Sequence, residues 1–298
     1  MKHKKVVVAA GATSAVSYAA YHAISKEMIK QVFNVHPTKE VIDPQYLGWL
    51  RNSRAVQARV GSFDGLKLVG LNIQNHEGAP YIIMVHGMRD TKVSLFSRAY
   101  EFDQLGYNIL LPDQRGTGDS DSAPYTYGFK ESQDLLVWIN YLITKDPEVQ
   151  IILYGQSMGA SAVMMATAYH LPENVKCLIE EGGFSSLEEE FSYYIQRKTG
   201  IRYTKPVLKI VEREMKEKFG MKYADVNPKQ CLENNEIPLL IIHGEEDQYV
   251  PFVMAKKIYN HNKGEKKYYP IANADHSNCS ESENYYMNLD AFIRAHID

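Results

Sequence analysis

The chain has 298 residues, of which 45% are hydrophobic and 23% charged, and its formal net charge is -3 at pH 7. These values are typical of a folded globular protein near the upper size that one hydrophobic core supports. Nucleic-acid binding needs a clustered basic face, so this balance argues against nucleic acid as the main partner. The three cysteines are widely spaced and form no CxxC pair, which argues against a disulfide framework and a structural zinc site.

The N-terminal segment differs in composition from the rest of the chain. Met1 to Lys5 contains three lysines, and Val6 to Ile24 follows without Asp, Glu, Lys or Arg. A positive start before an apolar run is typical of a signal peptide or a signal anchor. We therefore expect an N-terminal extension over residues 1–48 that attaches to a membrane through residues 6–24 or directs export, which favours the cell envelope over the cytoplasm. The alternative is an alanine-rich helix that packs on the protein.

From about residue 59 onward, short apolar runs alternate with segments of helical periodicity. Continuous apolar runs suit strands that are buried on both faces of a parallel sheet. The expected strands are Pro80–His86, Tyr107–Pro112, Gln150–Tyr154, Val175–Ile179, Pro238–His243 and Lys267–Ile271, and the helical segments between them include Val93–Leu105, Glu131–Lys145 and Ser157–His170. This alternation predicts an α/β fold with a mostly parallel central sheet flanked by helices.

Two stretches depart from this alternation. Ala55–Ile73 alternates around Asp64-Gly65, which predicts an antiparallel hairpin that leads into the sheet. Residues 187–236 contain no strand signal but two segments of helical periodicity, Leu187–Lys198 and Val207–Phe219. We expect these residues to form a small helical cap over the carboxyl ends of the strands, inserted into a core that comprises residues 49–186 and 237–298.

The most specific signal is the pentapeptide GQSMG, which centres on Ser157 between a predicted strand and a predicted helix. In this context the G-x-S-x-G pattern predicts a tight turn that exposes a nucleophilic serine. Glycines two residues to either side of the serine leave room for such a turn. The following helix directs its amino-terminal amides and the positive end of its dipole at the same place.

A serine hydroxyl needs a base, and the base needs an orienting acid. Asp247 and His276 follow Ser157 in the loops after the last two predicted strands, so all three are expected at one edge of the sheet. Glu180 and Glu181, after the strand Val175–Ile179, are the alternative acids. Asp275 directly precedes His276 and is expected to point away from it.

An oxyanion hole needs two donors aimed at the developing negative charge. We expect the backbone amides of Met158, which follows the nucleophile, and of Met88, in the loop after the first parallel strand. His86 and His243 each precede a glycine at a strand end and, with His276, would supply three nitrogen ligands for a metal. Local hydrogen bonds that brace the two loops explain His86 and His243 better.

The order of these motifs resembles that of the α/β-hydrolase superfamily over residues Gly61 to Ile297. The stretches that carry the resemblance are Ser62–Leu68, His86–Met88, Asp113–Ser120, Gly155–Gly159, Gly244–Pro251 and Ala274–Ser277. Within the superfamily the chain most resembles bacterial esterases and the serine-aminopeptidase-like branch. The resemblance implies hydrolysis of an ester, amide or thioester through an acyl-enzyme, without a cofactor or a metal, and a structural role for Arg115. The compact cap differs from the large caps of some lipases, which argues against long lipid substrates.

We therefore expect a serine hydrolase that cleaves carboxylic esters of small or medium acyl groups, with Ser157 as nucleophile, His276 as base and Asp247 as orienting acid. The cap residues Tyr193, Tyr194 and Tyr203 either shape the substrate pocket or only pack the cap.

A serine aminopeptidase or amidase that acts on small peptides is the enzymatic alternative. It would need an acidic group for the free α-amine, and Glu188, Glu189 and Glu190 at the start of the cap either supply one or form a solvated helix face. A non-catalytic binding protein on the same fold is the alternative from another class. The presence of all three candidate catalytic residues argues against it.

Overall fold

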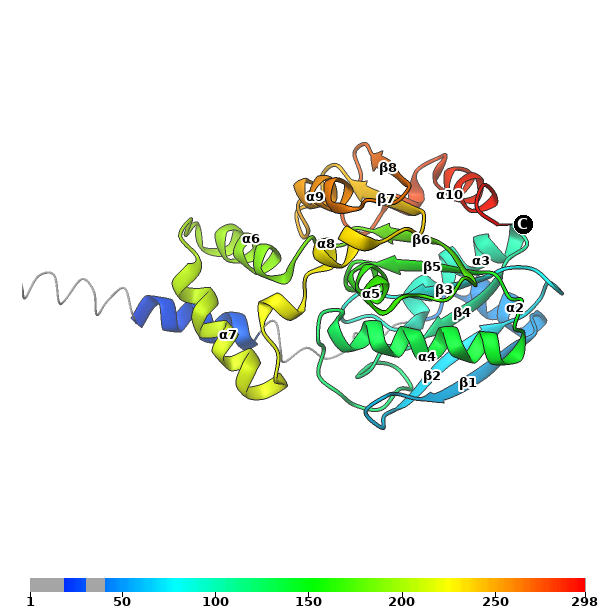
Figure 1. Ribbon diagram of the computed structural model, residues 1–298, viewed down its shortest axis with the longest axis horizontal. Helices are drawn as coiled ribbons and strands as arrows, with labels where there is room; N and C mark the ends of the chain where they lie inside the picture. The colour runs from blue at the N-terminus through cyan, green and yellow to red at the C-terminus, as the bar shows by residue number, and fades with distance from the viewer. Residues whose placement is uncertain (1–18, 31–40, 298) are drawn as a thin grey trace, which may run out of the picture. The chain divides into compact units, whose positions relative to one another are not determined.

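The computed structural model describes residues 19–30 and 41–297 (Figure 1). In these ranges the chain forms two compact units. The larger comprises residues 41–187 and 226–297 and contains the sheet, whereas the smaller combines Glu188–Asp225 with the helical residues 19–30. Residues 1–18, which hold most of the predicted apolar segment, lie outside the described residues. Among the described residues, no helix is both long and apolar enough to cross a membrane.

An eight-stranded sheet of order β1-β2-β4-β3-β5-β6-β7-β8 forms the centre of the larger unit. β1 pairs antiparallel with β2 and β2 with β4, and all other neighbours are parallel. The strands are β1 (Ala55–Gly61), β2 (Lys67–Ile73), β3 (Tyr81–Val85), β4 (Asn108–Pro112), β5 (Ile151–Gln156), β6 (Val175–Glu181), β7 (Leu239–Gly244) and β8 (Lys266–Ile271). The predicted α/β fold with a mostly parallel sheet and an antiparallel hairpin at its start is confirmed.

Helices cover both faces of this sheet (Figure 1). Successive residues of a strand point to opposite faces, and in β3 Ile83 packs in one buried cluster while Ile82 and Met84 pack in the other. The first cluster includes side chains of α4 (Phe129–Lys145), α5 (Met158–Ala166) and α9 (Val253–His261), and the second those of α3 (Phe96–Gln104) and α10 (Tyr285–Arg294). Because both faces are covered, the central strands are apolar throughout.

Helix α2 (Pro44–Asn52) also belongs to the larger unit. It begins where the Asp43 side chain accepts a hydrogen bond from the Gln45 amide at 3.0 Å, with Pro44 in the first turn. Trp49 connects α2 to α3, because its indole N–H donates a hydrogen bond to Asp103 Oδ2 at 2.8 Å. The larger unit therefore includes the end of the segment that is predicted to form the N-terminal extension. The shorter helical segments of the larger unit are η1 (Lys92–Leu95), η2 (Thr167–Tyr169), α8 (Pro228–Cys231), η4 (Leu232–Asn234) and η5 (Cys279–Glu281).

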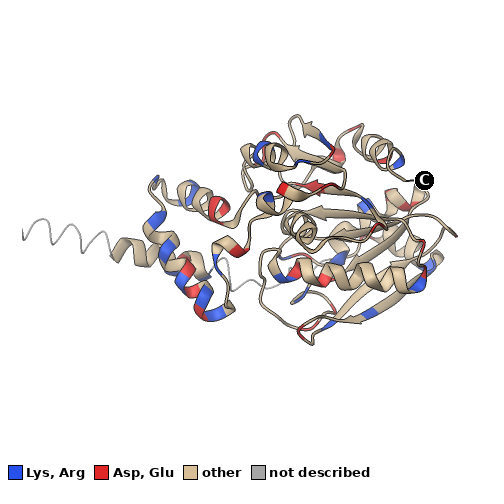
Figure 2. Cartoon of the chain, in the orientation of Figure 1, with Lys and Arg blue, Asp and Glu red and all other residues tan. Residues whose placement is uncertain are grey.

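The smaller unit consists of helices, among them α6 (Leu187–Thr199), α7 (Lys205–Phe219) and η3 (Tyr223–Asp225). The buried side chains of α7 recur at helical spacing, at Val207, Leu208, Val211 and Met215. Figure 2 shows acidic and basic residues interleaved along the same helix. Gly220 ends α7 in the left-handed region, at a φ of 68°, and its amide donates to the Lys216 carbonyl at 3.1 Å.

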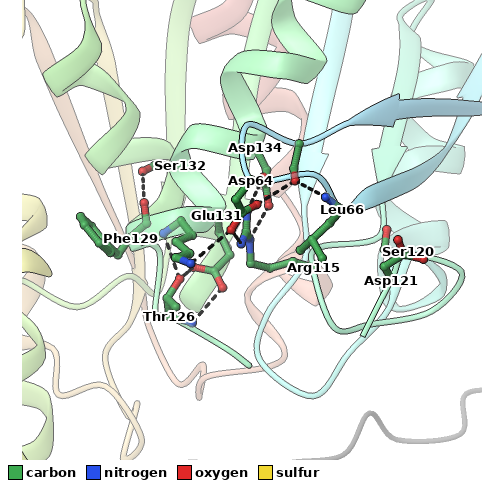
Figure 3. Close-up of polar contacts among 12 residues, drawn as sticks. Asp64, Leu66, Arg115, Ser120, Asp121, Thr126, Phe129, Glu131, Ser132 and Asp134 are labelled. Atoms are coloured by element: carbon green, nitrogen blue, oxygen red, sulfur yellow. Dashed lines mark hydrogen bonds and ion pairs between the residues drawn. The ribbon is translucent and has the colours of Figure 1, made fainter. Parts of the chain in front are cut away.

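Arg115 joins three parts of the larger unit (Figure 3). Its guanidinium donates to Asp64 in the β1–β2 turn, at 2.9 and 3.1 Å, and to Asp134 on α4, at 2.6 and 2.7 Å. Burial raises the pKa of Asp134 to about 6 even beside this cation. The turn before α4 is held by Glu131, whose side chain accepts hydrogen bonds from the backbone amides of Thr126 and Gly128, each at 2.9 Å. Arg115 therefore connects the β1–β2 turn to α4, as expected of a structural residue.

Candidate active site

Ser157 sits in the turn between β5 and α5 with a φ of 55° and a ψ of -117°, a conformation that side-chain-bearing residues rarely adopt. The flanking glycines make this turn possible. A Cβ at Gly155 would overlap the main-chain carbonyl of Gly159, and a Cβ at Gly159 would overlap that of Val85. The Ser157 amide donates to the Glu181 carbonyl at 2.8 Å, which holds the turn against the end of β6.

The structure brings the three predicted side chains together. His276 Nε2 lies 2.9 Å from Ser157 Oγ, and His276 Nδ1 lies 2.7 Å from Asp247 Oδ2. Asp247 follows β7 and His276 follows β8, so residues far apart in the chain meet at the carboxyl edge of the sheet. Ser157, His276 and Asp247 form one hydrogen-bonded line.

Asp247 is almost completely buried and accepts hydrogen bonds at both oxygens. Its Oδ1 accepts from the amides of Tyr249 and Val250 at 2.8 and 2.9 Å, and its Oδ2 faces His276 at 2.7 Å and His243 at 3.3 Å. Burial alone would raise the pKa of this carboxyl, but the hydrogen bonds from the two histidines hold it well below its usual range. Asp247 is therefore an anion that only accepts hydrogen bonds.

This anion fixes the tautomer of neutral His276. Because Asp247 only accepts, the proton of the ring lies on Nδ1, and Nε2 presents a lone pair to the Ser157 hydroxyl. The His276 ring packs against Tyr249, with ring centroids 5.6 Å apart, and a Cβ at Gly182 would lie 3.4 Å from it. The imidazole is thus placed to remove the hydroxyl proton.

The loop after β3 runs beside Ser157. A Cβ at Gly87 would lie 3.4 Å from Ser157 Cβ and 3.0 Å from Asp90 Oδ2, so a side chain there would fit tightly. Met88 follows in this loop, and Met158 is the first residue of α5. Met158 thus follows Ser157 directly, and Met88 follows the glycine that approaches Ser157, while their role as oxyanion donors stays a prediction.

The alternative acids face other partners within the described residues. Glu181 is buried and accepts from Arg98 Nη2 and Tyr154 Oη, each at 2.8 Å, and from the Tyr285 hydroxyl. Glu180 Oε2 accepts from the Gly183 amide at 2.9 Å, and burial raises the pKa of Glu180 to about 8. Asp275 accepts from the amide of Ser277 at 2.8 Å. The structure thus joins Asp247, and none of these three carboxyl groups, to His276.

His86 and His243 both form local hydrogen bonds. His86 Nε2 accepts from the Gln114 amide at 3.1 Å, and burial lowers the pKa of His86 to about 4. His243 Nε2 lies 2.9 Å from the Val250 carbonyl. Across residues 19–30 and 41–297, no group of three or more His, Cys, Asp or Glu side chains is arranged to hold a metal ion.

Sequence reasoning missed the contact between His243 and Asp247. His243 was interpreted only as a loop-bracing residue, although it ends the same strand that Asp247 follows, four residues earlier. In the folded protein its ring approaches the carboxylate at 3.3 Å, a contact between side chains that a strand pattern does not contain.

Comparisons with known proteins agree with this fold. A family model described as the alpha/beta hydrolase fold matches residues 80–204. A Bacillus subtilis relative, "Uncharacterized protein YqkD", is 26% identical over 214 residues, which cover 72% of this chain and 70% of the relative. The lysophosphatidylserine lipase ABHD12 of Rattus norvegicus is 26% identical over 196 residues, which cover 61% of this chain but only 45% of that lipase.

Two solved structures with the same fold are esterases. The esterase of Pyrococcus furiosus superposes with a TM-score of 0.69 and 20% identity, covering 89% of this chain and 98% of its own. The esterase of Exiguobacterium antarcticum has a TM-score of 0.58 and 18% identity, covering 80% of this chain and 99% of its own. At these identities the likeness is one of fold.

Proposed function

Because this chain belongs to the α/β-hydrolase superfamily, we propose that it is a serine hydrolase that cleaves carboxylic esters of small or medium acyl groups. The observation that carries the proposal is the hydrogen-bonded line from Ser157 through His276 to the Asp247 carboxylate. Serine is a weak nucleophile unless a base takes its proton, and this line supplies the base in the required tautomer.

The first half of the reaction forms the acyl-enzyme. Ser157 Oγ attacks the ester carbonyl carbon as its proton passes to His276 Nε2, and the Met88 and Met158 amides donate to the oxyanion. When the tetrahedral intermediate collapses, His276 returns the proton to the departing alkoxide, which leaves as an alcohol. Asp247 stabilises the imidazolium that exists between the two proton transfers.

The second half releases the acid and restores the enzyme. His276 removes a proton from a water molecule, whose oxygen attacks the acyl carbon. The second tetrahedral intermediate expels Ser157 Oγ, which takes the proton back from His276, and a carboxylic acid leaves the site. No step changes an oxidation state, and water is the second nucleophile.

A serine aminopeptidase is the second candidate, and Asp90 favours it. The Asp90 carboxylate and Ser157 Cβ both lie within 3.4 Å of the same point, the position of a Cβ on Gly87. A carboxylate in the same loop as Met88 suits a substrate with a positively charged α-amine beside the scissile carbonyl.

Initial rates on a substrate panel test the proposal. The panel contains p-nitrophenyl esters from acetate to dodecanoate, aminoacyl p-nitroanilides, and lysophosphatidylserine, which the name of one relative suggests. We expect the highest kcat/KM on short esters and no turnover by Ser157→Ala. Asp247→Asn should lower kcat by about 10⁴ with little change in KM, since the amide favours the wrong tautomer of His276.

The other results assign or reject the function. Faster cleavage of aminoacyl anilides, lost in Asp90→Asn, would move the assignment to an aminopeptidase. Preference for lysophosphatidylserine would make the chain a lipase. Absence of Ser157-dependent turnover on every substrate, together with no labelling of Ser157 by a fluorophosphonate, would reject a serine hydrolase.

A further inference from the structure

His243 is a fully buried histidine at the end of β7, and its Nε2 faces two acceptors. The Val250 carbonyl lies 2.9 Å from Nε2, and Asp247 Oδ2 lies 3.3 Å from it. Because a carbonyl oxygen only accepts hydrogen bonds, Nε2 must carry a proton. The protonated edge of the ring therefore faces Asp247 Oδ2 as well, whether the ring is neutral or charged.

The carboxylate of Asp247 is held at both ends by this arrangement. Its Oδ2 lies 2.7 Å from His276 Nδ1 and 3.3 Å from His243 Nε2, and its Oδ1 accepts from the amides of Tyr249 and Val250. Val250 takes part twice, because its amide donates to Oδ1 while its carbonyl accepts from His243. The hydrogen bond from His243 to Val250 thus holds the loop that follows β7 in place around the Asp247 carboxylate.

We propose that His243 is a positioning residue whose Nε2–H, bonded to the Val250 carbonyl and facing Asp247 Oδ2, keeps this carboxylate in the orientation required by His276. This inference rests on the proposed serine hydrolase function. His243 acts only through Asp247, because its buried side chain is separated from Ser157 by Asp247 and His276 in the hydrogen-bonded line. Without His243, the Asp247 carboxylate would keep its bonds to the Tyr249 and Val250 amides but would lose the nearby positive edge of the ring at Oδ2, and His276 would be less well aligned.

The surroundings of His243 argue against a role in packing alone. Among the described residues, His243 Nδ1 and Glu180 Oε1 are buried atoms without a hydrogen-bond partner. An unsatisfied buried polar atom costs about 1–3 kcal/mol, a cost that an aliphatic side chain at position 243 would not carry. The Nε2 donor is the property that histidine has there and an aliphatic side chain lacks.

Three substitutions separate the donor from the bulk and the polarity of the ring. In His243→Gln the amide nitrogen reaches the position of Nε2, in His243→Asn it does not, and in His243→Leu the donor is absent. We expect His243→Leu and His243→Asn to lower kcat on the best p-nitrophenyl ester by about 10–100-fold with little change in KM, as is typical when a positioning partner is lost. His243→Gln should restore most of the wild-type kcat. His261→Leu, which removes a histidine on α9 whose Nδ1 bonds only the Lys257 carbonyl, is the control.

Two further readouts do not depend on the choice of substrate. The rate constant of Ser157 labelling by a fluorophosphonate should follow the same order as kcat. In proton NMR spectra, the downfield resonance of the His276–Asp247 hydrogen bond should move in His243→Leu and His243→Asn and stay in place in His243→Gln. Circular dichroism and thermal unfolding establish which variants are folded, and the comparison of Gln with Asn remains decisive if the Leu variant does not fold.

Failure of this inference differs from failure of the proposed function. A wild-type protein that is no more active or more readily labelled than Ser157→Ala would reject the function. An active wild type whose folded Leu or Asn variants keep kcat, labelling rate and downfield resonance would overturn the positioning role. So would a folded Gln variant that is as impaired as the Asn variant.

Discussion

At the residue scale, the carboxyl groups of the adjacent residues Glu180 and Glu181 lie in different surroundings and have different hydrogen-bond partners. Both are buried at the end of β6. Glu181 has an ion pair with Arg98 at 2.8 Å and two tyrosine hydroxyl donors. Glu180 has one amide donor, and burial raises its pKa to about 8. Adjacent residues of a strand point to opposite faces of the sheet, so two neighbouring glutamates can have different environments.

This difference predicts a pH-dependent stability for Glu180→Gln. The pKa of Glu180 rises from 4.5 to about 8 on folding, so protonation favours the folded state. The contribution is complete below about pH 4.5 and is lost as the pH rises through about 8. Because glutamine does not ionise, the variant should gain stability relative to the wild type across this window, by a few kcal/mol in order of magnitude. Denaturant unfolding at a series of pH values measures the difference, and Glu148→Gln at the surface is the control. A difference that stays constant from acid to alkaline pH would contradict the raised pKa.

At the scale of elements, the turn between β5 and α5 depends on Gly159. A Cβ at this position would overlap the carbonyl of Val85, so β3 and α5 could not keep their present distance. We expect Gly159→Ala to lower the free energy of unfolding by about 1–3 kcal/mol and to slow fluorophosphonate labelling of Ser157.

Gly48→Ala is the matched control for that substitution. Gly48 lies in α2, and no atom lies within 4 Å of its added Cβ. Alanine favours the helix, so this variant should be more stable by about 0.5–1 kcal/mol. Equal effects of the two substitutions would show that the close approach of α5 to β3 is not what requires glycine.

The Arg115 network is a second feature at this scale, because its hydrogen bonds connect the β1–β2 turn to α4. Arg115→Met would leave Asp134 buried without its cation, and such a loss typically costs about 3–5 kcal/mol. Arg213→Met on α7, whose side chain is 62% exposed and pairs with Glu217 at 3.8 Å, should change stability by less than about 1 kcal/mol. Denaturant midpoints and slopes measure both. If Arg115→Met lowered the free energy of unfolding no more than Arg213→Met, the network would not stabilise the fold.

At the scale of the whole molecule, the protein holds its fold without a disulfide. All three cysteines are free, and Cys177 and Cys279 are buried. Burial raises the pKa of Cys177 to about 12, which removes the reactive thiolate at neutral pH. We expect iodoacetamide to modify the half-buried Cys231 first in the native protein and all three at similar rates after denaturation. Mass spectrometry of the alkylated peptides tests the order, and Cys177 reacting as fast as Cys231 before unfolding would contradict it. Reductant should leave Tm unchanged.

Much of the larger unit was predictable from sequence because its signals are local. Strands buried on both faces are continuous apolar runs, so β3 to β8 were located within one or two residues of their observed ends. The G-x-S-x-G turn between a strand and a helix indicated Ser157. The carboxyl ends of parallel strands share one edge, which is why Asp247 and His276 were expected near it.

The sequence by itself therefore determined the fold class, the strand order along the chain and the residues available for a catalytic site. Only the tertiary structure decided which carboxyl group meets His276, and it alone revealed that the ring of His243 approaches the same oxygen of Asp247. Helix α2 also depended on it, since this short helix is held to α3 by Trp49 and Asp103. The physical reason is that apolar periodicity reports burial along one element. Hydrogen bonds between side chains depend on distance and direction between elements, which no local pattern contains.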